Sequence, residues 1–462
     1  MNIVKYNLLL LILLSSSLVA SDLDSSLSQD HTYEKQSQAN QAMSIGNWKI
    51  FGDIRAGWVE YDYGNRPKGI DSSGNIIPTD SKVNKGHIDS KGIYVMPKLS
   101  VQSPYYNGLM FKATLVGVTD FDINDEKYES RTFAYDPKKR ESYALVQEGF
   151  LFYENANNKI LVGREELTTP MIDADDWYLL ANSFELARYQ NSSLEDTTIN
   201  LGYFHKMAGV WDSGADNDRG YDKTQFNSMA QASYLDQRDK DNAQGGLAFT
   251  SYTYNDNKNH QLQVWDYYGF DLYNTLFIQY DYTDEVSDFS YDAGIQVINF
   301  KEVDGNKYTK IDYTLYQARF DGEFGNGFNF ATGIAKYTDG EGQGATLGAF
   351  GGYPYFANGM IFHFFEAGSL QNAASYKGQI GYNLDKLGLK ETWIGYRYTF
   401  FDLDGEYSKN QNGLSQDGMR LNGVRISYGG DFGTYFTGTY EHVDLDNEPN
   451  TFSLRLIGGY KF

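Results

Sequence analysis

The last twelve residues of the chain, TFSLRLIGGYKF (451–462), decide its fold class. Every second position carries an apolar or aromatic residue or a glycine: Phe452, Leu454, Leu456, Gly458, Tyr460 and Phe462. The intervening positions include Ser453, Arg455 and Lys461. Because side chains of a β-strand point alternately to two faces, the segment has one apolar face and one largely polar face. This alternation predicts a strand with its apolar face toward lipid or toward a core.

Other segments repeat the alternation with the same period of two. The clearest are 48–58, 377–384 and 392–401, and in the last of these Arg397 lies opposite an aromatic row. Apolar residues on one face, polar residues on the other and aromatic residues near the ends are typical of strands in membrane barrels. A soluble β-sandwich would alternate too. The segment lengths, the N-terminal signal and the terminal Phe462 favour the membrane barrel.

The whole chain divides into eighteen such segments. We expect strands at 47–61, 88–102, 107–121, 142–154, 158–164, 183–191, 196–206, 244–254, 259–268, 272–284, 287–301, 310–323, 327–338, 374–384, 390–402, 418–429, 432–443 and 450–462. The count is even, as single-chain bacterial barrels require, and sixteen to twenty is the range that the pattern allows. Short connections alternate with long ones at 62–87, 122–141, 165–182, 207–243, 339–373 and 403–417. The fold class is therefore all-β, a closed antiparallel transmembrane β-barrel with long external loops.

The N-terminal region precedes this pattern. Lys5, the apolar run Leu8 to Leu14 and the small residues up to Ala20 predict a signal peptide over 1–20. Residues 21–45 are polar and form a predicted periplasmic tail, which leaves 46–462 for the barrel. A tail of this length cannot supply the plug domain of a TonB-dependent receptor.

Composition supports the barrel and excludes some functions. Aromatic residues make up 16% of the chain, with 47 Gly, 8 Pro and no Cys. This mixture suits many strands with a single apolar face, and a closed barrel needs no disulfides because it has no free edge. A formal charge of −22 argues against nucleic-acid partners, since no basic surface could neutralise phosphates. The acidic residues either keep exposed loops soluble or attract cations.

Basic residues recur on the faces predicted to line the lumen. They are Arg55, Arg164, Arg188, Arg319, Lys377, Arg397, Arg425 and Arg455. Guanidinium groups bind carboxylates with two hydrogen bonds, so a row of them could guide a passing anion in steps. Alternatively, these residues pair with Asp and Glu across a wet lumen.

Two acidic loops are further candidates. Loop 165–182 carries Glu165, Glu166, Asp173, Asp175 and Asp176. Inside the barrel these carboxylates would face the basic wall and create a transverse field; outside it they would be a solvated loop. The segment DSGADNDRGYD offers Asp212, Asp216, Asp218 and Asp222 as a weak calcium candidate, although their spacing does not match an EF-hand.

The sequence gives no indication of enzymatic activity. The six His residues have no local nucleophile signature, and no glycine-rich phosphate motif or Cys/His metal spacing occurs. We expect neither an enzyme nor a cofactor.

Four stretches resemble the OprD-like (Occ-type) family of outer-membrane porins. They are 143–184 (YALVQEGFLFYENANNKILVGREELTTPMIDADDWYLLANSF), 199–214, 247–283 and the glycine-rich 348–373. The chain has Tyr178 and Ala181 where family members often carry Arg and Pro. The resemblance implies an eighteen-stranded barrel whose third loop folds into the pore and whose wall carries a basic ladder. It also implies uptake of small carboxylates or amino acids, by monomers or homotrimers.

The sequence thus predicts a porin for passive, moderately selective diffusion of small hydrophilic solutes across a Gram-negative outer membrane. Expected partners are membrane lipid, lipopolysaccharide and the barrel assembly machinery, for which Tyr460 and Phe462 resemble the recognition signal. The alternatives are a general cation-preferring porin and a non-conducting adhesin or structural barrel.

Overall fold

The computed structural model describes most of the chain that follows the N-terminal region. The described residues are 43–45, 47–62, 90–124, 142–175, 179–209, 226–232, 245–256, 258–303, 310–362, 367–409, 413–430, 433–448 and 450–462. The predicted signal peptide, most of the predicted tail, Asp176 and the calcium candidates Asp212, Asp216, Asp218 and Asp222 lie outside these residues. Among the described residues, no helix is both long and apolar enough to cross a bilayer.

Eighteen long strands form the body of the molecule. They are β2 (Trp48–Asp62), β3 (Ser90–Gln102), β4 (Leu109–Val118), β5 (Tyr143–Glu154), β6 (Asn158–Glu165), β7 (Ser183–Asn191), β8 (Thr197–Ala208), β10 (Leu247–Asn255), β11 (His260–Gly269), β12 (Tyr273–Val286), β13 (Phe289–Glu302), β14 (Asp312–Phe324), β15 (Phe328–Tyr337), β16 (Ala374–Asn383), β17 (Thr392–Asp402), β18 (Gly418–Gly429), β19 (Thr434–Leu445) and β20 (Thr451–Lys461). The shorter elements are β1 (Met43–Ile45), β9 (Asn227–Ser228), α3 (Met229–Ala232), α4 (Gln343–Thr346) and η3 (Leu384–Leu387). Residues 43–45, expected in the tail, therefore form a strand.

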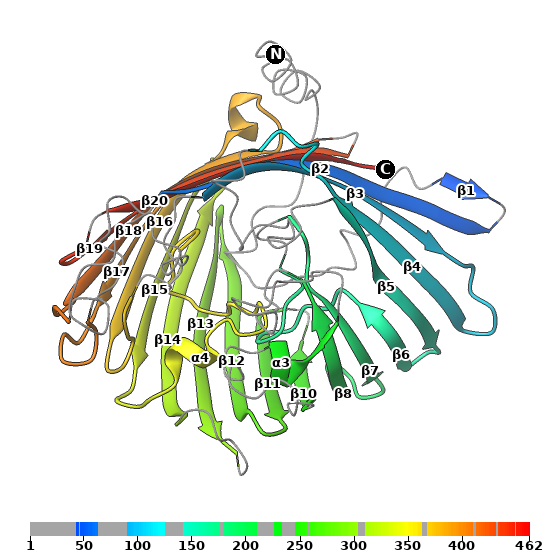
Figure 1. The fold of residues 1–462 in the computed structure, drawn as a ribbon, viewed down its shortest axis with the longest axis horizontal. Helices are drawn as coiled ribbons and strands as arrows, with labels where there is room; N and C mark the ends of the chain where they lie inside the picture. The colour runs from blue at the N-terminus through cyan, green and yellow to red at the C-terminus, as the bar shows by residue number, and fades with distance from the viewer. Residues whose placement is uncertain are drawn as a thin grey trace.

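The long strands close into a ring. Each pairs antiparallel with its sequence neighbour, β8 pairs with β10, and β2 pairs with β20 to complete the circle (Figure 1). Since every long strand has two partners, the ring has no free edge for other chains to pair with. The prediction of a closed, eighteen-stranded antiparallel barrel is confirmed.

The two faces of the ring have opposite character. Large apolar side chains such as Ile295, Ile380 and Ile394 are exposed on its outside. Polar and charged side chains such as Gln296, Gln379 and Arg397 are buried on its inside. A soluble protein shows the reverse arrangement, so the outer surface is suited to lipid.

One irregularity of the ring places two neighbouring polar residues in the lumen. A β-bulge in β5 shifts its register against β4 between Thr114 and Leu115. The extra residue lets both Gln147 and Glu148 be buried, where a regular strand would point one of them outward. Both contact the loop that follows β6.

Candidate functional site: two loops inside a charged lumen

The loop between β6 and β7, residues 166–182, folds into the barrel. At its start, Lys98 on β3 donates to both carboxylate oxygens of Glu166 at 2.6 Å. Arg188 on β7 holds Glu165 through two hydrogen bonds of 2.8 Å. Two of the five acidic residues predicted for this loop, Glu165 and Glu166, are therefore ion-paired to the inner wall.

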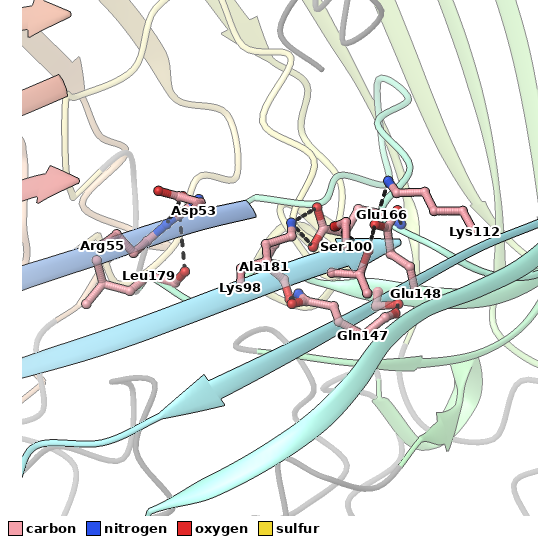
Figure 2. A network of polar contacts seen from close by, with 12 residues as sticks. Asp53, Arg55, Lys98, Ser100, Lys112, Gln147, Glu148, Glu166, Leu179 and Ala181 are labelled. Atoms are coloured by element: carbon pink, nitrogen blue, oxygen red, sulfur yellow. Dashed lines mark hydrogen bonds and ion pairs between the residues drawn. The ribbon is translucent and has the colours of Figure 1, made fainter. Parts of the chain in front are cut away.

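The end of the same loop is held through its backbone. Arg55 on β2 donates to the carbonyl of Leu179 at 3.3 Å, and Gln147 donates to the carbonyl of Ala181 at 2.7 Å (Figure 2). Leu179 and Leu180 are buried. The predicted insertion of the third loop into the pore is confirmed, and the loop is fixed at both ends.

A chain of alternating charges lies beneath the start of the loop. Lys112 on β4 contacts Glu148 at 2.7 Å, and Thr114 donates to the same carboxylate at 2.7 Å. Glu148 also accepts from the backbone N–H of Glu166 at 3.4 Å, which links it to the Lys98–Glu166 pair (Figure 2). The side chains of Glu148 and Glu166 are only 3% and 5% exposed. Two lysines offset two glutamates, so the cluster carries no net charge.

The middle of the loop contacts a second inserted loop. Asp173 accepts from Thr168 at 2.6 Å, and its backbone N–H donates to the carbonyl of Phe350 at 3.1 Å. Ile172 also bridges to Phe350. Asp175 is half-buried. The second loop, residues 338–373 between β15 and β16, was not expected to enter the lumen.

Loop 338–373 runs along the inner wall and is fixed there mainly through its backbone. Gln296 donates to the carbonyl of Pro354 at 2.8 Å, and Gln317 accepts from the N–H of Phe356 at 2.8 Å. Farther along, Thr399 donates to the carbonyl of Asn358 at 2.8 Å. Glu441 on β19 accepts from backbone N–H groups of residues 360–362. The loop thus crosses several strands of the wall.

A row of glutamines supports this loop. Gln317 donates to Gln296, and Gln296 donates to Gln279 at 2.7 Å. Gln279 in turn donates to Asp281 at 2.6 Å. The three amides lie in register on β12, β13 and β14. They form a continuous polar strip that ends on the loop backbone.

Tyr355 adds an aromatic ring to the buried part of loop 338–373. Burial raises the pKa of Tyr355 well above its usual value, so the phenol stays neutral. It therefore contributes bulk to the loop but no charge to the lumen.

Arg319 on β14 is surrounded by carboxylates. It lies 2.8 Å from Asp281, 2.8 Å from Asp292 and 3.3 Å from Asp321. Its guanidinium also packs over the ring of Phe356, 5.0 Å from the centroid. Three carboxylates surround this guanidinium, and Lys377 on β16 is a second cation close to Asp321.

The remaining basic residues of the wall have several kinds of partner. Arg55 pairs with Asp53 at 2.8 Å, and Arg164 pairs with Glu185 at 2.7 Å. Arg164 also stacks over Phe226, 4.0 Å from the ring centroid. In these two cases the cation has a carboxylate partner in the lumen.

Four others lie close together on β16, β17, β18 and β20. Arg397 donates to Gln379 at 2.8 Å and to the carbonyl of Gly359 at 3.0 Å. Arg425 donates to Thr439 at 3.0 Å, and Thr439 separates it from Arg455 in the strand register. Lys377 is buried on β16. We call Lys377, Arg397, Arg425 and Arg455 the basic arc; it begins beside the carboxylates around Arg319, since only Gly333 lies between Arg319 and Lys377 in the strand register.

The C-terminal residues help to close the ring. Phe462 and Gly52 exchange two backbone hydrogen bonds, of 2.8 and 2.9 Å, and the rings of Tyr460 and Phe462 stack 6.2 Å apart.

In the part of the chain that the structure describes, no group of three or more His, Cys, Asp or Glu could hold a metal ion.

The closed barrel with loops folded into its lumen is similar in fold to solved structures of outer-membrane proteins, some of them porins by name. Pseudomonas aeruginosa OpdK, crystallised with vanillate, matches with a TM-score of 0.69 and 14% identity over 90% of this chain and 98% of its own. A BenF-like porin from Pseudomonas fluorescens Pf-5 matches with a TM-score of 0.68 and 13% identity over 90% and 99% of the two chains. Acinetobacter baumannii OccAB4 matches with a TM-score of 0.68 and 14% identity over 92% and 99%.

These similarities concern the fold. No protein-family model matches the sequence, and no curated protein matches it. The fold that the sequence resemblance implied is confirmed.

Proposed function

We propose that this chain is an outer-membrane porin through which small hydrophilic solutes diffuse passively. The exposed apolar outer face suits a bilayer, and the lumen carries polar and charged side chains that replace water around a solute. The fold shared with Occ-type channels supports the same function. In this reading the long loops lie outside the cell and both inserted loops narrow the path.

The finer proposal is a preference for carboxylates and amino acids. It rests on one observation, the basic arc, which places four cations on neighbouring strands of one part of the wall. Arg397 and Arg425 donate to neutral amide, hydroxyl and carbonyl groups of the lumen, and Arg397 also acts electrostatically on Glu441 of β19. Charge-assisted hydrogen bonds to a passing carboxylate are stronger than those to such neutral groups, so an anion gains by approaching them.

The test replaces Arg397, Arg425 and Arg455 together by Gln and measures solute uptake into proteoliposomes. We expect uptake of a small carboxylate to fall, while uptake of a neutral sugar of similar size is retained. Sugar uptake also reports any change in pore size, because Arg397 contacts loop 338–373. The matched control is Arg420→Gln, since Arg420 lies on β18 and pairs with Asp446 at 3.2 Å outside the basic arc. Equal uptake ratios in wild type and triple variant would contradict the preference.

A second candidate, a cation-preferring porin, is favoured by the carboxylates around Arg319. If cations follow that part of the wall, Asp292→Asn should shift the reversal potential under a potassium chloride gradient away from the potassium equilibrium value. No shift would leave the basic arc as the determinant of selectivity.

The terminal residues support a proposal about assembly. Tyr460 and Phe462 stack on one side of β20, where an assembly machinery could read them before β2 pairs with this strand. Deleting Phe462 should lower the amount of folded barrel in the outer membrane. Unchanged levels would show that the signal lies elsewhere.

A further inference from the structure

The structure contains a backbone site already filled by a carboxylate of the protein itself. Glu441 is 1% exposed on the inner face of β19. Its Oε1 accepts from the N–H of Met360 at 2.6 Å, and its Oε2 accepts from Ile361 at 2.5 Å and from Phe362 at 2.7 Å. Three successive N–H groups thus converge on one carboxylate, the geometry of an anion-binding nest.

Two guanidinium groups stand next to this nest. In the strand register Gly423 lies between Arg397 and Glu441, so the strand between them contributes no side chain. Arg397 acts electrostatically on the Glu441 carboxylate, and its Nη1 donates to the carbonyl of Gly359. Arg425 donates to the carbonyl of Met360 at 3.3 Å. The two guanidinium groups and the three N–H donors therefore lie along the same short segment of loop 338–373.

The packing leaves room for a carboxylate and for little else. A Cβ added to Gly359 would lie 2.9 Å from Oε1 of Glu441, and one added to Gly423 would lie 2.8 Å from the sulfur of Met360. Contacts that short do not occur, so an alanine at either position would displace the side chains that hold the loop. The missing side chains at these two residues let the loop approach β18 and β19 closely.

We propose that the backbone of residues 360–362, with Arg397 and Arg425, is a binding site for a small carboxylate, and that Glu441 is its built-in ligand. The position of loop 338–373 then depends on a carboxylate in this site, whichever molecule supplies it. Without the Glu441 side chain, a free monocarboxylate of formate or acetate size fits the vacated volume. The channel readout of this proposal rests on the proposed porin function; the binding itself does not.

The experiment is chemical rescue of Glu441→Ala. In chloride buffer we expect this variant to show a lower thermal transition in detergent and a larger, noisier single-channel conductance than wild type, because the nest loses its ligand and the loop is released. Acetate should raise the transition and restore the conductance in a saturable way, since a ligand that binds only the folded state stabilises it. Acetamide, which has the same shape without the charge, should do neither.

Two further variants serve as controls. Glu441→Gln keeps the side-chain volume, so it should loosen the loop but fail to respond to acetate. Glu323→Ala removes another carboxylate of the inner wall, one that accepts from Asn383 at 2.7 Å, and should not respond to acetate either. An acetate response of similar size in either control would mean a general salt effect and would overturn the proposal.

The result that contradicts the site is a Glu441→Ala variant whose thermal transition and conductance are unaffected by acetate. If the variant does not assemble in chloride buffer, refolding with and without acetate becomes the test: acetate-dependent assembly supports the site, and equal failure overturns it. A wild-type protein that forms no channels would refute the porin function, and the thermal measurement would still decide whether acetate binds.

Discussion

Loops 166–182 and 338–373 both enter the lumen, but different chemistry holds them there. The first loop is fixed at its start by ion pairs, Lys98–Glu166 and Arg188–Glu165, with Lys112 and Glu148 beneath them. The second is fixed by its own backbone N–H and carbonyl groups, which meet wall side chains such as Gln296, Thr399 and Glu441. The start of the first loop therefore depends on charge balance, whereas the second loop depends on close approach of the main chain.

This difference determines which substitutions each loop tolerates. Removing one partner of a buried ion pair leaves an uncompensated charge, whereas removing both is much less costly. A loop held by its backbone tolerates most changes of its own side chains. An atom added between the loop and the wall, however, displaces the loop. The following predictions test the two modes separately.

The largest change is expected from shortening the first loop. Removing residues 167–176 deletes its contact with Phe350 but leaves the anchors at Glu166 and Leu179. Single-channel conductance should rise while heat-modifiable migration of the barrel is kept, because no wall strand is altered. Unchanged conductance would place this loop outside the narrowest part of the path.

A smaller effect is expected from breaking one ion pair. Lys98→Met should destabilise docking of the loop by about 3 kcal/mol, near the low end for buried pairs since Lys98 is partly exposed. Conductance should increase, and the double variant Lys98→Met/Glu166→Gln should return toward wild type. The control Lys91→Met changes a lysine of the same strand whose side chain is 44% exposed and lies 4.0 Å from Glu60, and it should have no effect. A double variant worse than the single one would refute the charge-balance account.

The smallest effect concerns the second loop. Gly423→Ala places a Cβ against Met360 and should displace residues 359–362 at a cost of about 1–3 kcal/mol, without any change of charge. The matched control is Gly378→Ala, since nothing lies within 4 Å of a Cβ at that glycine. Thermal transitions of the two variants compare them directly, and equal values would argue against close main-chain approach as the anchor.

The strands of the barrel could be predicted closely from the sequence. All eighteen strands were predicted, and the largest errors are three residues, at 121 against Val118 and at 244 against Leu247. Alternation is a property of side chains, and barrel strands must display it because lipid and lumen lie on opposite faces. The bulge that places Gln147 and Glu148 together has no such signature.

The same reasoning applies to the site. Glu165, Glu166 and the basic wall residues could be predicted because charged side chains stand out on an inner face. Loop 338–373 could not, since its anchors are main-chain groups of residues such as Pro354, Gly359 and Met360. The role of Glu441 was missed for this reason: a lone glutamate on a strand gives no sign that three backbone N–H groups meet it.

We expect this barrel to conduct ions and its lumen to favour carboxylates. The most direct measurement is a planar-bilayer recording of the purified wild-type protein under a gradient of potassium acetate. We predict discrete ohmic channels. Their reversal potential should have the sign expected when acetate permeates more readily than potassium, because the basic arc offsets the acidic loops along the path. A reversal potential close to the potassium equilibrium value, or the absence of channels, would contradict a carboxylate-preferring porin.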